Sequence, residues 1–215
     1  MSPVCQALDI LQAEDKAYLG VLLPTIAVII QRLNDIYASG TLAICLPLLK
    51  TLKENIQRRF RSQMKEMDCL LAAAFHPHFK LAWLHPREED LKQTVKQKMI
   101  SLLDMRALDE NSSPSEEQFE KDDFFGSLYI HKEKKSTSRD LVECFLHDKP
   151  QKKKLNDAFP NLQFRDMFIR YNTAIPSSAA VERIFSIGKD ILKPKRSGLS
   201  DKHFEMLVFL KGLHV

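Results

Sequence analysis

Apolar residues recur at spacings of three and four along the first third of the chain, which is the pattern of amphipathic helices. In residues 14–35 this stripe comprises Leu19, Leu22, Leu23, Ile26, Ile29, Ile30 and Leu33. In residues 41–67 a second stripe comprises Ile44, Leu48, Leu49, Leu52, Ile56 and Phe60. Because each stripe needs a neighbour to bury it, the two segments predict an antiparallel helical hairpin. Pro24 predicts an interruption or kink in the first helix, since proline has no amide donor.

The later pattern predicts more helices, joined by loops of distinct composition. A third long helix is expected from Pro86 to about Arg106, and shorter ones over residues 140–146, 160–171, 178–187 and from Leu199 onward. Between residues 109 and 123 there are seven acids and one base around a run of serines, a composition typical of flexible loops. These changes divide the chain into a helical segment (1–106), an acidic and basic linker (107–136) and a C-terminal region (137–215).

Composition agrees with a mainly α fold. Among 215 residues there are 6 Gly and 13 Phe, which leaves little material for tight β-hairpins or phosphate-binding loops. Hydrophobic residues make up 44% and charged residues 28%, so a wholly disordered chain, a collagen-like chain and a disulfide miniprotein are excluded. The net charge of +4 permits a nucleic-acid partner without requiring one.

Candidate metal ligands do not form a recognisable set. The four cysteines are isolated along the chain: Cys5, Cys45, Cys69 and Cys144. Zinc sites need grouped ligands, so ordinary buried thiols in a reducing compartment are expected. His76, His78 and His85 are followed by no second ligand pair, and we expect them at the mouth of a helical core. No metal and no cofactor are therefore predicted.

No membrane segment is predicted either. The longest uncharged stretch covers residues 17–30, shorter than the roughly 20 residues that a spanning helix needs. No cationic stretch precedes an apolar run near the N-terminus, as a secretory signal would require. We therefore expect a soluble intracellular protein with no membrane partner, in which residues 17–30 form a buried core helix.

The C-terminal region carries the most specific motif in the chain. Residues 171–188, Tyr-Asn-Thr-Ala-Ile-Pro-Ser-Ser-Ala-Ala-Val-Glu-Arg-Ile-Phe-Ser-Ile-Gly, resemble the C-terminal signature of hAT-superfamily DNA transposases. Pro-Lys-Arg at 194–196 and Leu-Ser-Asp at 199–201 continue the same pattern. A weaker match lies at residues 75–80, Phe-His-Pro-His-Phe-Lys, where family members commonly carry Leu-Asp-Pro-Arg-Phe-Lys and His76 replaces the acid.

The resemblance implies a fold and an expectation about catalysis. It implies a helical-insertion fragment plus the C-terminal helices of a split RNase H-like domain, in a domesticated relative of BED-finger-type transposases. Such enzymes hold two divalent metals with three acids, and Glu182 matches the third; the first two belong to upstream strands that this chain does not contain. One glutamate cannot assemble a two-metal site, so Glu182 is expected to be inactive and the chain is not expected to be an enzyme.

The same resemblance implies a function in protein association. In the family this region is a dimerisation segment, so a homodimer or a complex with related hAT-type proteins is expected. The candidate interface residues are Phe185, Ile187, Leu192, Leu199, Phe204, Leu207, Phe209 and Leu210. An intrachain core built from the same side chains is the alternative, and both arrangements can hold together.

Two other functions remain open from the residues. One is weak, non-specific binding of nucleic acid through basic clusters that include Lys152, Lys153, Lys154, Lys193, Lys195 and Arg196. The other is a fragment that completes a transposase active site in trans. A nuclear location is expected, with a cytoplasmic location as the alternative.

Overall fold

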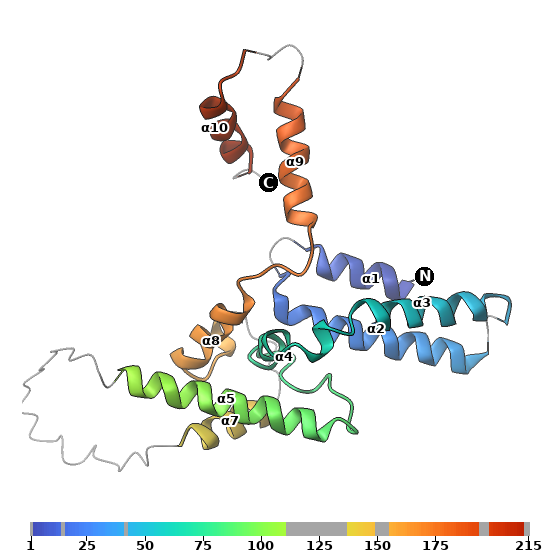
Figure 1. The fold of residues 1–215 in the computed structure, drawn as a ribbon, viewed down its shortest axis with the longest axis vertical. Coiled ribbons are helices and arrows are strands. Elements are labelled where there is room, and N and C mark those ends of the chain that lie inside the picture. The colour runs from blue at the N-terminus through green and yellow to red at the C-terminus, as the bar shows by residue number, and fades with distance from the viewer. Residues whose placement is uncertain are drawn as a thin grey trace, which may run out of the picture.

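The computed structural model describes residues 2–13, 16–40, 43–110, 137–148, 155–193 and 198–212. All regular structure within these ranges is helical, which confirms the mainly α prediction. The α-helices are α1 (Ser2–Leu11), α2 (Leu19–Ser39), α3 (Leu46–Arg59), α4 (Met67–Ala74), α5 (Glu89–Glu110), α7 (Ser138–His147), α8 (Leu162–Asn172), α9 (Ala179–Ile191) and α10 (Asp201–Gly212). Helices α1 to α8 form a body, from which α9 and α10 project (Figure 1).

The first two predicted helices have different bounds in the structure. A separate helix, α1, precedes α2, which begins at Leu19 and ends where Gly40 adopts φ 65°. The predicted interruption at Pro24 is wrong, because α2 continues through this residue. Pro24 lies in the second turn of α2, where its missing amide donor leaves the Gly20 carbonyl without a helical hydrogen bond.

The predicted helix over residues 41–67 is likewise interrupted. Its middle forms α3, which ends at Arg59, and a short 3-10 turn, Gln63–Lys65, precedes α4. Helix α3 packs alongside α2, as the predicted hairpin requires. The third long helix, α5, runs from Glu89 to Glu110 and so extends four residues into the segment predicted as a linker. Residues 111–136 of that predicted linker lie outside the described residues.

The main core lies around α4. Leu70, Leu71, Ala74 and Phe75 are buried there between α2, α5 and α8. Val142 and Phe145 of α7 and Phe164, Met167 and Phe168 of α8 belong to the same buried cluster. Residues on both sides of the predicted 107–136 linker therefore share one core, and α9 and α10 lie outside it.

Polar contacts fix the helices of the body to one another. The buried side chain of Asn172 accepts a hydrogen bond from the Gly20 amide at 2.7 Å and donates one to the Ala72 carbonyl at 3.0 Å. These two bonds join α2, α4 and α8. Ion pairs between Lys96 and Glu143 and between Arg106 and Asp166 attach α5 to α7 and to α8.

Helix α2 is the one described helix whose length and composition would let it cross a membrane. Half of its most apolar window is buried within the body, including Leu22, Leu23 and Ile26. This burial against α4 and α8 is the core-helix packing expected for residues 17–30.

Candidate association site on the C-terminal hairpin

Helices α9 and α10 pack against each other as a hairpin. Gly188 lies against Phe204, and a β-carbon on the glycine would be 3.3 Å from Cζ of the phenylalanine. Ile191 is buried, and Ile187, Phe204 and Leu207 are half-buried. The inner faces of the two helices are therefore covered by each other.

The base of α9 is attached to the end of α1. The hydroxyl of Ser177 donates to the carbonyl of Leu11 at 2.9 Å. The guanidinium of Arg183 donates twice to the carbonyl of Gln12, at 3.1 and 3.2 Å. These contacts lie in the linking segment and the first turns of α9, and the rest of the hairpin extends away from the body (Figure 1).

The outer faces of the hairpin are apolar and exposed. Phe185 on α9 is 71% exposed and Phe209 on α10 is 65% exposed. The other large apolar side chains that are exposed here are Val181, Ile184, Leu192, Met206 and Leu210. Helix α10 is apolar on both sides, since Phe204 and Leu207 lie toward α9 while Met206 and Phe209 are exposed. A helix of that kind is normally buried all round.

The predicted interface residues thus fall into two groups. Exposed on the hairpin are Phe185, Leu192, Phe209 and Leu210. Half-buried are Ile187, Leu199, Phe204 and Leu207. The sequence reasoning did not include Val181, Ile184 and Met206, which are exposed. Val181 precedes Phe185 by four residues and Met206 precedes Phe209 by three, which places each on the same face as that phenylalanine.

Glu182 lies in the first turn of α9 and is exposed. Its carboxylate accepts a hydrogen bond from the Ser178 hydroxyl at 2.6 Å, and a negative charge at this end of a helix is favourable. Ser178 occupies the N-cap position of α9, but its side chain bonds Glu182 instead of a backbone amide. Among the described residues, no three His, Cys, Asp or Glu side chains form a group that could hold a metal ion. The prediction of buried thiols holds for Cys69 and is wrong for Cys5, Cys45 and Cys144, which are exposed.

The histidine segment is built into the core. His76 is buried beside the rings of Tyr18, Phe79 and Phe168, and its Nδ1 accepts a hydrogen bond from the His78 amide at 3.3 Å. Burial, followed by the charge of His78, lowers the pKa of His76 to about 3, so its ring is neutral at ordinary pH. His76 therefore serves as a packed, hydrogen-bonded side chain.

The basic residues singled out in the sequence are largely beyond the described part of the chain. Lys152, Lys153, Lys154, Lys195 and Arg196 lie outside the described residues. Lys193 is described and is exposed at the end of α9.

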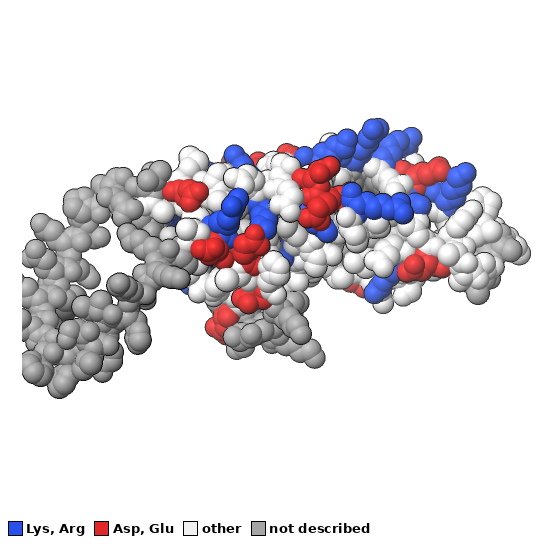
Figure 2. All heavy atoms as spheres, turned by 90° about the horizontal axis from the view of Figure 1, so that it is seen from below, with Lys and Arg blue, Asp and Glu red and all other residues white. Residues whose placement is uncertain are grey.

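A different basic face lies along α3 and the turn after it. It consists of six cations: Lys50, Lys53, Arg58, Arg59, Arg61 and Lys65. Glu54 is the one carboxylate within this stretch, and none of the six forms an ion pair with a carboxylate in the described ranges. Figure 2 shows Lys and Arg side chains gathered over the end of the body where α2 and α3 lie. The sequence contains these residues, but only the structure shows that they are unpaired within the described ranges.

Comparison with known proteins identifies no relative of this chain. No protein-family model matches the chain, and searches of curated proteins and of solved structures return no match.

Proposed function

We propose that this chain is a protein derived from a hAT-type transposase that lacks a complete catalytic triad and acts by protein association. The associating surface is the outer face of the α9–α10 hairpin, and the partner is a second copy or a related hAT-type protein. The exposed apolar side chains of both helices, led by Phe185 and Phe209, carry the proposal. The motif in residues 171–188 supplies the family.

The energetics favour covering this surface. Full burial of a Phe side chain contributes about 1.5–3 kcal/mol, so covering Phe185 and Phe209, each about two thirds exposed, contributes about 1–2 kcal/mol apiece. Five more large apolar side chains lie exposed on the same two helices. Contiguous apolar patches of this kind mark interaction sites in soluble proteins.

The absence of catalysis is part of the proposal. Two-metal phosphoryl transfer needs several carboxylates around ions about 4 Å apart. Glu182 is exposed and is hydrogen bonded to Ser178, with no cluster of further ligands in the described ranges. An RNase H-like origin of α9 and α10 and a nuclear location belong to the same proposal and rest on the sequence motif.

A second candidate is non-specific binding of nucleic acid, which the α3 basic face favours. Its six cations lie within residues 50–65, and this stretch contains a single carboxylate, Glu54. Phosphate contacts by such a face release counterions and weaken steeply with salt. Binding of a labelled duplex that is insensitive to salt, or that persists after Lys50→Glu and Arg58→Glu, would remove this candidate.

Sedimentation equilibrium of the purified chain tests association. We expect a dimer at tens of micromolar, and a shift toward monomer in the variant Phe185→Ser/Phe209→Ser. The matched control is Ile169→Ser on α8, which removes an exposed apolar side chain of the body. A wild-type chain that stays monomeric throughout this range contradicts the proposal.

A further inference from the structure

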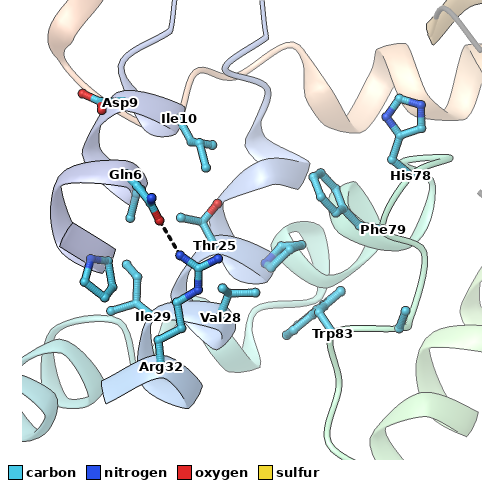
Figure 3. Close-up of a pocket in the computed structure, with 14 residues that line it drawn as sticks. Gln6, Asp9, Ile10, Thr25, Val28, Ile29, Arg32, His78, Phe79 and Trp83 are labelled. Atoms are coloured by element: carbon cyan, nitrogen blue, oxygen red, sulfur yellow. Dashed lines mark hydrogen bonds between the residues drawn. The ribbon is translucent and has the colours of Figure 1, made fainter. Parts of the chain in front are cut away.

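A groove lies on the body between α1, α2 and the turn that follows α4 (Figure 3). Its volume is about 600 Å³. The walls are mainly apolar, with Ile10, Val28, Phe79 and Trp83 among the lining residues. The indole N–H of Trp83 donates to the Lys80 carbonyl at 3.1 Å, so the polar atom of this side chain is already satisfied. The groove therefore offers apolar and aromatic surface that can receive a side chain.

Two opposite charges lie at the border of this groove. The guanidinium of Arg32 reaches across it and donates a hydrogen bond to Gln6 (Figure 3). Asp9 lies on α1 next to Ile10 and is one of the lining residues (Figure 3). Neither charge forms an ion pair with a partner in the described ranges.

The outer face of α9 has a matching pattern. Val181 and Phe185 lie four residues apart on one side of the helix, and exposed Leu192 follows directly after its last residue. Glu182 and Lys189 flank this side. They are seven residues apart, or about 10.5 Å along a helix. An acid and a base thus accompany an apolar stripe that includes Phe185, the most exposed large apolar side chain of the described hairpin.

We propose that α9 of one copy docks into this groove on a second copy, an inference that rests on the proposed association through α9 and α10. Phe185 enters between Val28 and Trp83, and Glu182 pairs with Arg32. Lys189 then lies toward Asp9. The exchange is reciprocal, so each copy supplies one helix and one groove and the assembly closes as a two-fold dimer.

A second copy is the occupant because the chain's own α9 cannot reach the groove. Its first turns are held at the end of α1 by the bonds from Ser177 to Leu11 and from Arg183 to Gln12. From there α9 extends away from the body (Figure 1). The groove also adds two opposite-charge pairs, Glu182 with Arg32 and Lys189 with Asp9, to the burial of Phe185.

Charge exchange tests the inference on the full chain. Sedimentation should show that Arg32→Glu and Glu182→Arg each weaken the dimer about tenfold, and that combining them in one chain restores it. Lys98→Glu, an exposed charge reversal on α5, is the control and should leave the dimer unchanged. Circular dichroism of each variant verifies that it is folded.

Trp83, the only tryptophan in the sequence, provides a second measurement in the groove itself. Its emission should move to shorter wavelength as dilute wild-type chain is concentrated, because Phe185 excludes water from the indole. Dimers that form without this change, and that do not respond to Arg32→Glu, overturn groove docking and leave association through the hairpin standing. A chain that never dimerises overturns both.

Discussion

Substitution of Gly20 by Ala should destabilise the body, because this residue lies where α2, α4 and α8 meet. Its amide donates to Oδ1 of Asn172 at 2.7 Å, and the Asn172 amide group donates to the Ala72 carbonyl at 3.0 Å. A β-carbon on Gly20 would lie under 3.0 Å from both the Ala72 carbonyl oxygen and Oδ1 of Asn172. Because one of these atoms is backbone and the other belongs to a buried side chain that makes two hydrogen bonds, α2 has to shift.

The expected change in the free energy of unfolding combines two destabilising contributions and one stabilising contribution. Forcing extra volume into a packed site costs about 1–3 kcal/mol. Breaking the bond between Gly20 and Asn172 leaves buried polar groups unsatisfied, at about 1–3 kcal/mol. Alanine has a higher helix propensity than glycine, which returns about 1 kcal/mol. We therefore expect a net loss of about 1–5 kcal/mol, a large part of the 5–15 kcal/mol typical of a domain.

Urea unfolding followed by far-UV circular dichroism measures this loss. Gly20→Ala should lower the unfolding midpoint without changing the dependence on urea. Gly212→Ala, at the end of α10 with nothing within 4 Å of the added carbon, is the control and should have little effect. If Gly20→Ala is as stable as the wild type or more so, helix propensity dominates and the reasoning about the junction is refuted.

Three further predictions concern single groups. The pKa of His76 in the folded state is about 3, below its ordinary value of 6.5, so the free energy of unfolding should fall as the pH drops from 6.5 toward 3. Urea midpoints measured at stepped pH should show this slope, and His76→Gln should flatten it. Burial, then the Glu66 carboxylate, raises the pKa of Cys69 to about 11, so iodoacetamide should label it far more slowly than exposed Cys5, and equal rates would contradict the buried placement. Thr137 caps α7 in a capping box with Asp140, so Thr137→Ala should cost about 0.5–2 kcal/mol in urea unfolding, whereas an unchanged midpoint would show that the cap contributes nothing.

The helices of the body were largely predictable from apolar spacing, but their ends were not. The stripe of residues 41–67 continues in sequence through Phe60, yet α3 ends at Arg59 and the chain turns there. Phe60 directly follows α3 and Met64 lies in the 3-10 turn, and both pack against the main core. Their apolar character therefore reflects burial outside the helix and not its continuation. Periodicity cannot distinguish these two causes, since both place apolar residues three to four positions apart.

The candidate site was located by its motif, but its orientation was not. The eight predicted interface residues include Phe204 and Leu207, which lie toward α9, and exclude Met206, which is exposed. Because α10 is apolar on both sides, no inner face can be recognised from its sequence. The groove residues Arg32 and Trp83 lie far from α9 in the sequence and far from each other. They come together in one groove only when the body folds, so no pattern in the sequence predicts the groove.

The two sides of α10 should respond differently to the same substitution. Leu207→Glu places a carboxylate between α9 and α10, so it should melt the hairpin and reduce the helical signal. Phe209→Glu places the same group on the outer side, where Phe209 is 65% exposed, so the monomer should retain its helices while the dimer weakens. Sedimentation and circular dichroism of the two variants separate these effects. If Phe209→Glu loses helix as Leu207→Glu does, the outer face contributes to folding of the single chain, and its exposure is no longer an argument for a partner.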